Sequence, residues 1–134
     1  MNRILSFLIL VLAGSIAVAA RGPSKQNLNR DVLRAIAEAP FRARTRQNPY
    51  QQRPDAVLAG EKLFRHHCAQ CHGTDGSGVG RAASLRSPAV QNATPGELEW
   101  FLRNGNLRAG MPSWSGLPEQ RRWQIVAYLK TLRE

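Results

Sequence analysis

The chain has 134 residues and a mass of 14.9 kDa, enough for one domain with a short extension but not for two domains. Hydrophobic residues make up 43% of the chain, which excludes wholesale disorder, and two cysteines are too few for a disulfide-stapled miniprotein. The net charge of +10 favours an acidic partner, either a protein face, nucleic acid or anionic lipid. Composition alone does not choose among these partners.

The first twenty residues have the pattern of an export signal. Arg3 provides a short positive region, an apolar stretch without charge follows, and small residues end it at Ala19 and Ala20. We therefore predict that residues 1–20 are a signal peptide cut after Ala19 or Ala20, and that the rest is exported to the periplasm or beyond. Because about 17 apolar residues just span a membrane, an uncleaved N-terminal anchor is the alternative. The cleaved chain has no stable membrane span.

Residues 21–55 form a basic arm that contains prolines and few large apolar side chains. Apolar spacing predicts a short helix over residues 29–39, after which Pro40, Pro49 and Pro54 favour an extended path. The arm is either a solvated linker or a strap along the domain surface that could also bind a partner. Basic charge without regularly interleaved aromatic residues is a weak nucleic-acid signal, and export argues against DNA, so we expect no nucleic-acid partner.

Residues 56–134 are predicted to form one all-α domain with about three main helices. Apolar side chains recur there at helical spacing, and no stretch alternates with a period of two. Asp55 is the predicted N-cap of the first helix, in which Gly60 leaves a smooth spot. The second helix follows Thr94, and the third begins at Pro118. The predicted spans are 56–69, 95–104 and 118–134.

Local signals also mark the ends of the second helix and the loops around it. Thr94 and Glu97 have the spacing of a capping box, with a proline at the first helical position, and Gly105 closes the helix. Two long loops remain, at roughly residues 70–93 and 105–117, and both are rich in Gly, Ser and Pro. Loops of this length in so small a domain need something to pack against, and a large apolar cofactor would answer that need.

The run Cys68-Ala69-Gln70-Cys71-His72 is the attachment signature of c-type haem. A helical turn over residues 68–72 places both sulfurs on one side of the chain, where they reach the two vinyl groups on one edge of a porphyrin. His72 then lies beneath the ring centre and offers a nitrogen to iron. We therefore predict one covalently bound haem c, held by Cys68, Cys71 and His72.

Three other kinds of site use similar residues. A thioredoxin-type redox pair needs a βαβ setting, which the pattern does not show. A zinc site needs four ligands, whereas Cys68, Cys71 and His72 give three, with only His66 and His67 beside them and no second Cys-x-x-Cys. A plain disulfide is compatible with export but explains neither His72 nor the long loops. Haem attachment is the interpretation that accounts for all of these features.

The second axial ligand of the iron is predicted by elimination. The methionines are Met1 and Met111, and Met1 leaves with the signal. His66 and His67 lie just before the attachment turn and are interpreted as surface or packing residues. Met111 stands between a glycine and a proline on the second loop, which can wrap to the far face of the ring, although a lone Met is more often core filler. A His/Met pair favours the reduced state and leaves no open position on iron, so we predict electron transfer and no enzymatic activity.

Three groups of residues occur in the order that one known family has them. They are Gly60 and Phe64 with Ile125 and Tyr128, the stretch Cys68 to Gly78, and Met111-Pro112-Ser113-Trp114. By these motifs, residues 56–134 resemble a small bacterial class I cytochrome c of the short monohaem type. The resemblance implies that the first and last helices cross closely at a glycine, that an aromatic ring fills the gap, and that the loops wrap around one haem.

One stretch departs from the pattern of that family. Relatives usually have a proline shortly before the leucine that corresponds to Leu85, in a region that presents a backbone carbonyl to the axial histidine. Here that stretch is Ala82-Ala83-Ser84-Leu85. We expect the carbonyl of Ala83 or a neighbour to orient His72 instead, with Pro88 as the candidate substitute for the missing proline.

The sequence therefore predicts a one-electron carrier outside the cytoplasm, whose redox partners have acidic docking surfaces. The residues chosen for steering such partners are Lys62, Arg65, Arg81 and Arg108, for each of which a solvated surface charge is the simpler interpretation. One alternative is a cytochrome c subunit docked on an exported dehydrogenase or oxidase, which would give the basic arm a purpose. Another is a haem peroxidase or sensor, in which Met111 dissociates to open the iron.

Overall fold

The computed structural model describes residues 24–133, so the predicted signal segment lies outside the described residues. Within that range the chain is all-α, as predicted, with one isolated bridge between Asn106 and Met111 in place of any strand. None of the helices in this range has the length and apolarity to cross a membrane. The elements are α1 (Lys25–Ala37), α2 (Phe41–Arg44), α3 (Pro54–His67), α4 (Ala69–His72), α5 (Pro88–Gln91), α6 (Pro95–Asn104), the 3-10 turn η1 (Leu107–Ala109) and α7 (Glu119–Leu129).

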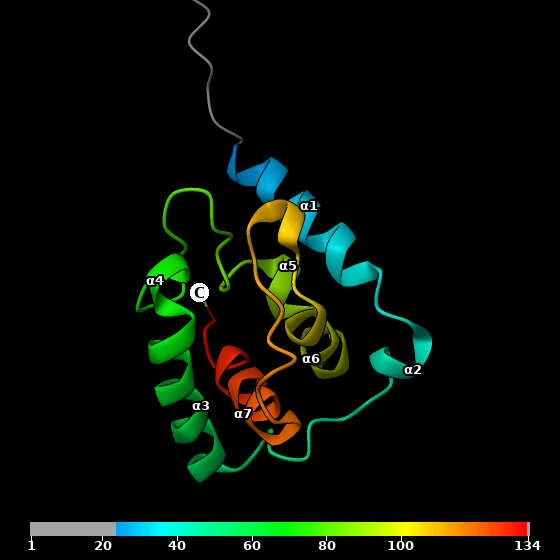
Figure 1. Cartoon of the computed structure of the whole chain (residues 1–134), viewed down its shortest axis with the longest axis vertical. Coiled ribbons are helices and arrows are strands. Elements are labelled where there is room, and N and C mark those ends of the chain that lie inside the picture. Colours follow the sequence, from blue (N-terminus) through cyan, green and yellow to red (C-terminus); the bar gives the residue numbers. More distant parts are fainter. Residues whose placement is uncertain (1–23, 134) are drawn as a thin grey trace, which may run out of the picture.

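Helices α3 and α7 lie side by side and form the most extensive helix pair (Figure 1). Gly60 lies at their crossing, where a Cβ atom would be only 1.9 Å from the backbone carbonyl oxygen of Gln124. Phe64 and Ile125 are fully buried beside this point, and the ring centroids of Phe64 and Tyr128 are 5.3 Å apart. The close crossing of the first and last domain helices is therefore confirmed, and it depends on the missing side chain at residue 60.

The predicted ends of the helices are correct for α6 and wrong for α3, and the last helix, predicted over residues 118–134, ends at Leu129 as α7. Thr94 and Glu97 form the capping box, in which the Glu97 N–H donates to Thr94 Oγ1 at 3.2 Å and the Thr94 N–H donates to the Glu97 carboxylate at 2.7 Å. Helix α3 starts at Pro54, and its N-cap is Arg53 rather than Asp55. Proline suits the first helical position because its missing N–H is not needed there, and Asp55 pairs with Arg53 instead.

The two long loops contain short helical segments that the sequence pattern did not predict. Helix α5 and most of α4 lie within residues 70–93, and the turn η1 lies within residues 105–117. Helices of four residues such as α2, α4 and α5 are too short to show an apolar repeat, although the turn at residues 68–72 was expected from its chemistry. Pro88 occupies the first position of α5.

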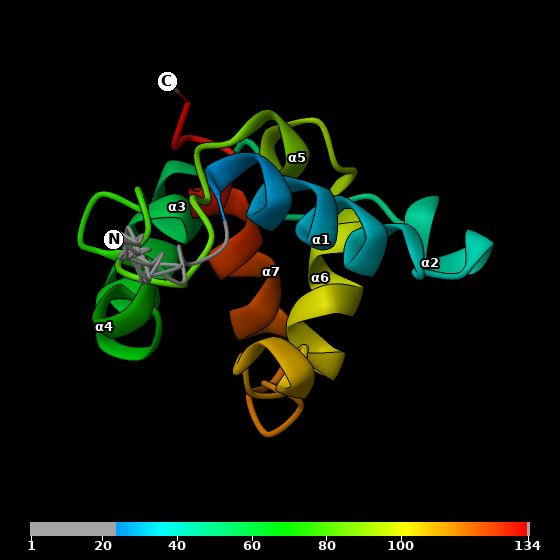
Figure 2. The same cartoon turned by 90° about the horizontal axis from the view of Figure 1, so that it is seen from above.

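The described part of the arm lies on the domain as a strap, and the linker interpretation is wrong for it. Helix α1 runs across α5 and α6 (Figure 2). Ile36 on α1 is 4% exposed and belongs to the main hydrophobic core. Beyond α2, the side-chain amide of the buried Asn48 donates to the Trp123 carbonyl at 2.8 Å. The helix predicted over residues 29–39 starts four residues earlier, at Lys25, and ends at Ala37.

Ion pairs attach the second half of the arm to α6 and α7. Arg46 pairs with Glu119 and lies 3.4 Å from the carboxylate of Glu99. Its guanidinium carbon also lies 5.0 Å from the centroid of the Trp123 ring, which is cation–π distance. The arm therefore belongs to the folded body of the protein from α1 onward.

The Glu119 pair is expected to make this attachment sensitive to acid. Hydrogen bonds from Arg46 and then from Trp123 hold the pKa of Glu119 below its ordinary value of 4.5. A carboxylate with a lowered pKa stabilises the folded state fully above the unfolded-state value, and this contribution is lost as the pH falls through the folded-state value. Glu119→Gln should therefore lose less unfolding free energy than the parent between about pH 6 and about pH 3, as measured by urea denaturation. An identical pH dependence in both proteins would contradict this assignment.

Candidate functional site

Cys68, Cys71 and His72 come together where α3 ends and α4 begins. Cys68 caps both helices, and its carbonyl accepts hydrogen bonds from the N–H groups of Cys71 and His72 at 3.1 and 2.9 Å. This is a single helical turn of the kind predicted for the motif. Both thiols are free, Cys71 is exposed, and burial raises the pKa of Cys68 to about 11. Because neither sulfur is used in a disulfide, both remain free to bond to another group, although the raised pKa keeps Cys68 in its thiol form near pH 7.

The imidazole of His72 is oriented by a backbone carbonyl. Its Nδ1 lies 2.9 Å from the carbonyl oxygen of Ala83. Since a carbonyl only accepts, Nδ1 donates its proton, and the lone pair is left on Nε2, the nitrogen that an axial ligand presents to iron. Burial lowers the pKa of His72, against a smaller opposite effect of this hydrogen bond, so the ring is neutral near pH 7. Sequence reasoning named Ala83 or a neighbour for this role, and the structure shows Ala83.

The loop after α4 folds back onto the attachment turn and so supports the stretch that lacks the proline. The Gly78 N–H donates to the His72 carbonyl at 2.8 Å. Gly78 has a φ of +86°, and a Cβ atom there would lie 2.5 Å from the carbonyl oxygen of Ala82. The Leu85 N–H donates to the Gly76 carbonyl at 2.8 Å. Backbone contacts from glycines therefore hold the residues on both sides of Ala83.

Met111 lies on a closed loop between α6 and α7. Asn106 and Met111 exchange two backbone hydrogen bonds of 2.9 and 3.0 Å. At the base of the loop, a Cβ atom on Gly105 would lie 2.6 Å from the carbonyl group of Pro112. The Met111 side chain is half-buried and packs against the hydrophobic core. Its backbone is thus held on both sides of the loop.

The hydrophobic core brings the two motifs together. Cys68 and Met111 both pack against the same cluster of buried residues. The ring of Trp114, on the loop of Met111, lies 5.2 Å from the ring of His67, directly before Cys68. His66 is exposed and touches His67 edge-on at 4.5 Å, so these two histidines are the surface and packing residues that the sequence indicated.

These residues fit a covalently bound haem. Two free thiols lie on one helical turn, an imidazole beside them is oriented through Nδ1, and a thioether lies at the same apolar core. A protein-only metal site has less support, because residues 24–133 contain no group of three or more His, Cys, Asp or Glu side chains that could hold an ion. The assignment of Cys68, Cys71, His72 and Met111 as haem ligands stays a prediction.

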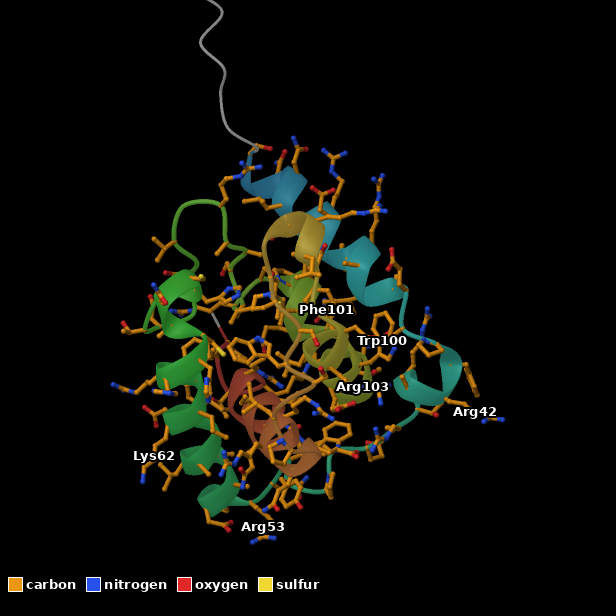
Figure 3. All side chains as sticks on the ribbon, in the orientation of Figure 1. Arg42, Arg53, Lys62, Trp100, Phe101 and Arg103 are labelled. Carbon is orange, nitrogen blue, oxygen red and sulfur yellow. The ribbon has the colours of Figure 1, made fainter. Side chains whose placement is uncertain are left out.

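An open groove with basic residues runs between α3 and the start of α7. Lys62, His66 and Arg121 are among the residues that line it, and Lys62 points away from α3 into solvent (Figure 3). Arg65, the next predicted steering residue on α3, is paired with Glu61 at 2.8 Å. Of these two charges, Lys62 is therefore the better placed to act on a partner. The remaining steering candidates, Arg81 and Arg108, are exposed.

Comparisons with known proteins find c-type cytochromes. The family model described as cytochrome c oxidase, cbb3-type, subunit III matches residues 55–129. Cytochrome c550 of Pseudomonas aeruginosa is 28% identical over 135 residues, which cover 92% of this chain and 91% of that protein. The cytochrome bc1 complex cytochrome c subunit of Corynebacterium diphtheriae is 30% identical over 83 residues, but these are 60% of this chain and only 29% of the subunit.

The fold has a counterpart among solved structures. Cytochrome CL from the marine methylotrophic bacterium Methylophaga aminisulfidivorans matches with a TM-score of 0.58 and 26% identity. The match covers 66% of this chain and 61% of that one. The family match spans more than half of the chain, and it starts within one residue of the predicted domain boundary. The chain belongs to the small class I c-type cytochromes, a family of electron-transfer proteins that carry a covalently bound haem c with its iron.

Proposed function

We propose that the chain is an exported one-electron carrier in which Cys68 and Cys71 hold one haem c, and His72 and Met111 are its axial ligands. The observation that carries this proposal is the hydrogen bond from His72 Nδ1 to the Ala83 carbonyl, beside two free thiols on one helical turn. When bound, the haem supplies a one-electron redox centre, Fe(II)/Fe(III).

The chain's own residues have separate tasks at this site. The thiols of Cys68 and Cys71 anchor the group, and the Ala83 carbonyl keeps the imidazole of His72 in one orientation and makes Nε2 a stronger donor. Met111 offers its sulfur from a loop whose ends are held together, and the adjoining core excludes water. Two protein ligands leave no open coordination position, which favours electron transfer over oxygen or peroxide chemistry.

The direct test is a visible spectrum with a redox titration of the full chain, produced in a host that attaches haem c. We expect a pyridine haemochrome with two thioether links and a methionine–iron(III) charge-transfer band, with no carbon monoxide binding by the reduced protein. The Cys68→Ser and Cys71→Ser proteins should each keep one thioether link, because each sulfur binds one of the two vinyl groups on the edge of the ring. The absorption maximum of their pyridine haemochrome should therefore shift from the position typical of two links to that of one. A colourless product from a competent host would contradict the proposal.

Export belongs to the same proposal and needs its own measurement. The apolar segment before Arg21 has the composition of a cleavable signal. After cell fractionation, we expect the coloured protein in the periplasmic fraction, with an N-terminus that starts after Ala19 or Ala20. A full-length protein in the membrane fraction would support the N-terminal anchor instead.

We also propose that basic residues near the α3–α7 groove steer an acidic redox partner. Lys62 is exposed and projects into solvent (Figure 3), whereas the charge of Arg65 is partly neutralised by Glu61. The bimolecular electron-transfer rate with an acidic partner should therefore fall as salt is added. Lys62→Glu should lower that rate several-fold at low salt, and more than the matched Arg65→Glu. A rate independent of ionic strength would end the steering hypothesis.

A second candidate function is that of a subunit docked on a larger redox complex. The matching family is named for an oxidase subunit, and the Corynebacterium relative for a subunit of the bc1 complex. Native gel electrophoresis of extracts from the source organism separates the two candidates. Haem staining that migrates with a larger complex would favour the subunit, and migration as a small protein would favour the free carrier.

A further inference from the structure

A buried ion pair joins α6 to α7 next to the loop that carries Met111. The side chains of Glu99 and Arg122 are 2% and 7% exposed, and Arg122 Nε donates to Glu99 Oε1 at 2.8 Å. Taking two charges out of water is costly, and apolar residues of similar volume often serve stability as well or better. The pair therefore needs an explanation other than the stability of the fold.

The other side of the Arg122 guanidinium faces the loop. Its Nη1 donates to the carbonyl of Leu117 and lies 3.5 Å from the carbonyl of Ser115. These carbonyls belong to the last residues of the loop that begins at Gly105. A planar guanidinium with donors on several sides can bond a carboxylate and backbone carbonyls at once, which a lysine ammonium cannot do in the same geometry. Arg122 thus connects Glu99 to the end of the loop.

The third member of this group comes from the arm. Arg46 Nη1 lies 3.4 Å from Glu99 Oε2, the carboxylate oxygen that Arg122 Nε does not use. Each oxygen of the buried carboxylate therefore has its own arginine, one from the arm and one from α7. A continuous series of polar contacts runs from Arg46 through Glu99 and Arg122 to the carbonyls of Ser115 and Leu117.

We propose that Arg122, held by Glu99 and Arg46, is a positioning residue that keeps the loop in the conformation in which Met111 binds iron. This inference rests on the proposed axial role of Met111. The Asn106–Met111 bridge closes the first part of the loop, the Trp114 N–H donates to the Leu102 carbonyl of α6, and Arg122 holds the other end of the loop. The basic arm thereby contributes to the site, since its Arg46 completes the group of side chains that orients Arg122.

The test measures how easily an added ligand displaces Met111 in the oxidised full-length holoprotein. Imidazole is titrated into the parent, Arg122→Lys and the control Arg121→Lys, whose arginine is the exposed neighbour on α7. Because a hydrogen bond to a charged group is lost at the loop, Arg122→Lys should bind imidazole about tenfold more tightly and lose its methionine–iron(III) band correspondingly earlier. Amide hydrogen exchange at Met111 should also be faster. Arg121→Lys should match the parent.

The contribution of the arm has a matched pair of variants. Arg44 and Arg46 have side chains that are 44% and 42% exposed, and each pairs with a glutamate of α6. If both arginines only held the arm against α6, Arg44→Gln and Arg46→Gln would change imidazole binding equally. The proposal instead expects only Arg46→Gln to tighten imidazole binding. Equal effects would overturn the part assigned to Arg46.

The outcomes separate this inference from the proposed function. A parent without a methionine–iron(III) band would refute Met111 as ligand. A parent that has the band, with Arg122→Lys equal to Arg121→Lys, would leave that ligand in place and overturn the positioning role. If Arg122→Lys does not fold, Glu99→Gln is the substitute, because it keeps the volume at residue 99 and removes the charge that holds Arg122.

Discussion

Gly60→Ala is expected to lower the free energy of unfolding by about 3 kcal/mol, the upper end of the usual cost of overpacking. The new Cβ atom would lie 1.9 Å from the Gln124 carbonyl oxygen, far inside contact distance. That oxygen belongs to the backbone of α7, which cannot turn aside as a flexible side chain would. Helices α3 and α7 must therefore separate, and the contact between Phe64 and Tyr128 loosens with them.

The control for this prediction is Gly116→Ala, because a Cβ atom there meets nothing within 4 Å. Its unfolding free energy should stay within about 0.5 kcal/mol of the parent. Alanine is also the better helix former by about 1 kcal/mol, so any loss at residue 60 comes from the contact with α7 and not from helix propensity. Urea denaturation followed by haem absorbance measures both variants, and an undiminished stability in Gly60→Ala would refute the close crossing.

Met111→Ala is expected to abolish the methionine–iron(III) band and to lower the reduction potential by on the order of 0.1 V, within the about 0.8 V range that axial ligands cover. A thioether favours Fe(II), and its loss removes that preference. The open position should then bind carbon monoxide in the reduced state, whereas the parent is expected not to bind it. The measurements are the visible spectrum of the oxidised protein, a redox titration and carbon monoxide binding.

Leu107→Ala is the matched control for Met111→Ala, since Leu107 lies on the same loop and is 77% exposed. Its spectrum and potential should equal those of the parent. If the parent lacked the methionine–iron(III) band and Met111→Ala left its spectrum unchanged, Met111 would not be the ligand, and His67 and His66 would be the next residues to substitute. His67 already contacts the loop through Trp114, so it is the first of the two to test.

Short-range signals in the sequence predicted much of the fold correctly. The capping box of Thr94 and Glu97 involves neighbours three residues apart, so backbone geometry alone decides it. Asp55 was misassigned because an acidic residue is favoured both as N-cap and in the first helical turn, and the preceding proline took the first helical position. Helices α2 and α5 were not predicted because a helix of a single turn is too short to show an apolar repeat.

The sequence alone predicted three parts of the candidate site: the attachment turn, its histidine and the loop that carries Met111. The turn and its histidine depend on a spacing of a few positions, and Met111 was predicted because methionine is scarce in this chain. Which carbonyl faces His72 was decided by the fold of the loop that brings Ala83 back onto the attachment turn. Long-range packing decided the docking of the arm and the series of contacts from Arg46 to the Met111 loop. Arg46 and Glu99 are 53 positions apart, and Glu99 and Arg122 are 23 apart. No local pattern records such partners, because two charges become neighbours only when the helices that carry them are packed together.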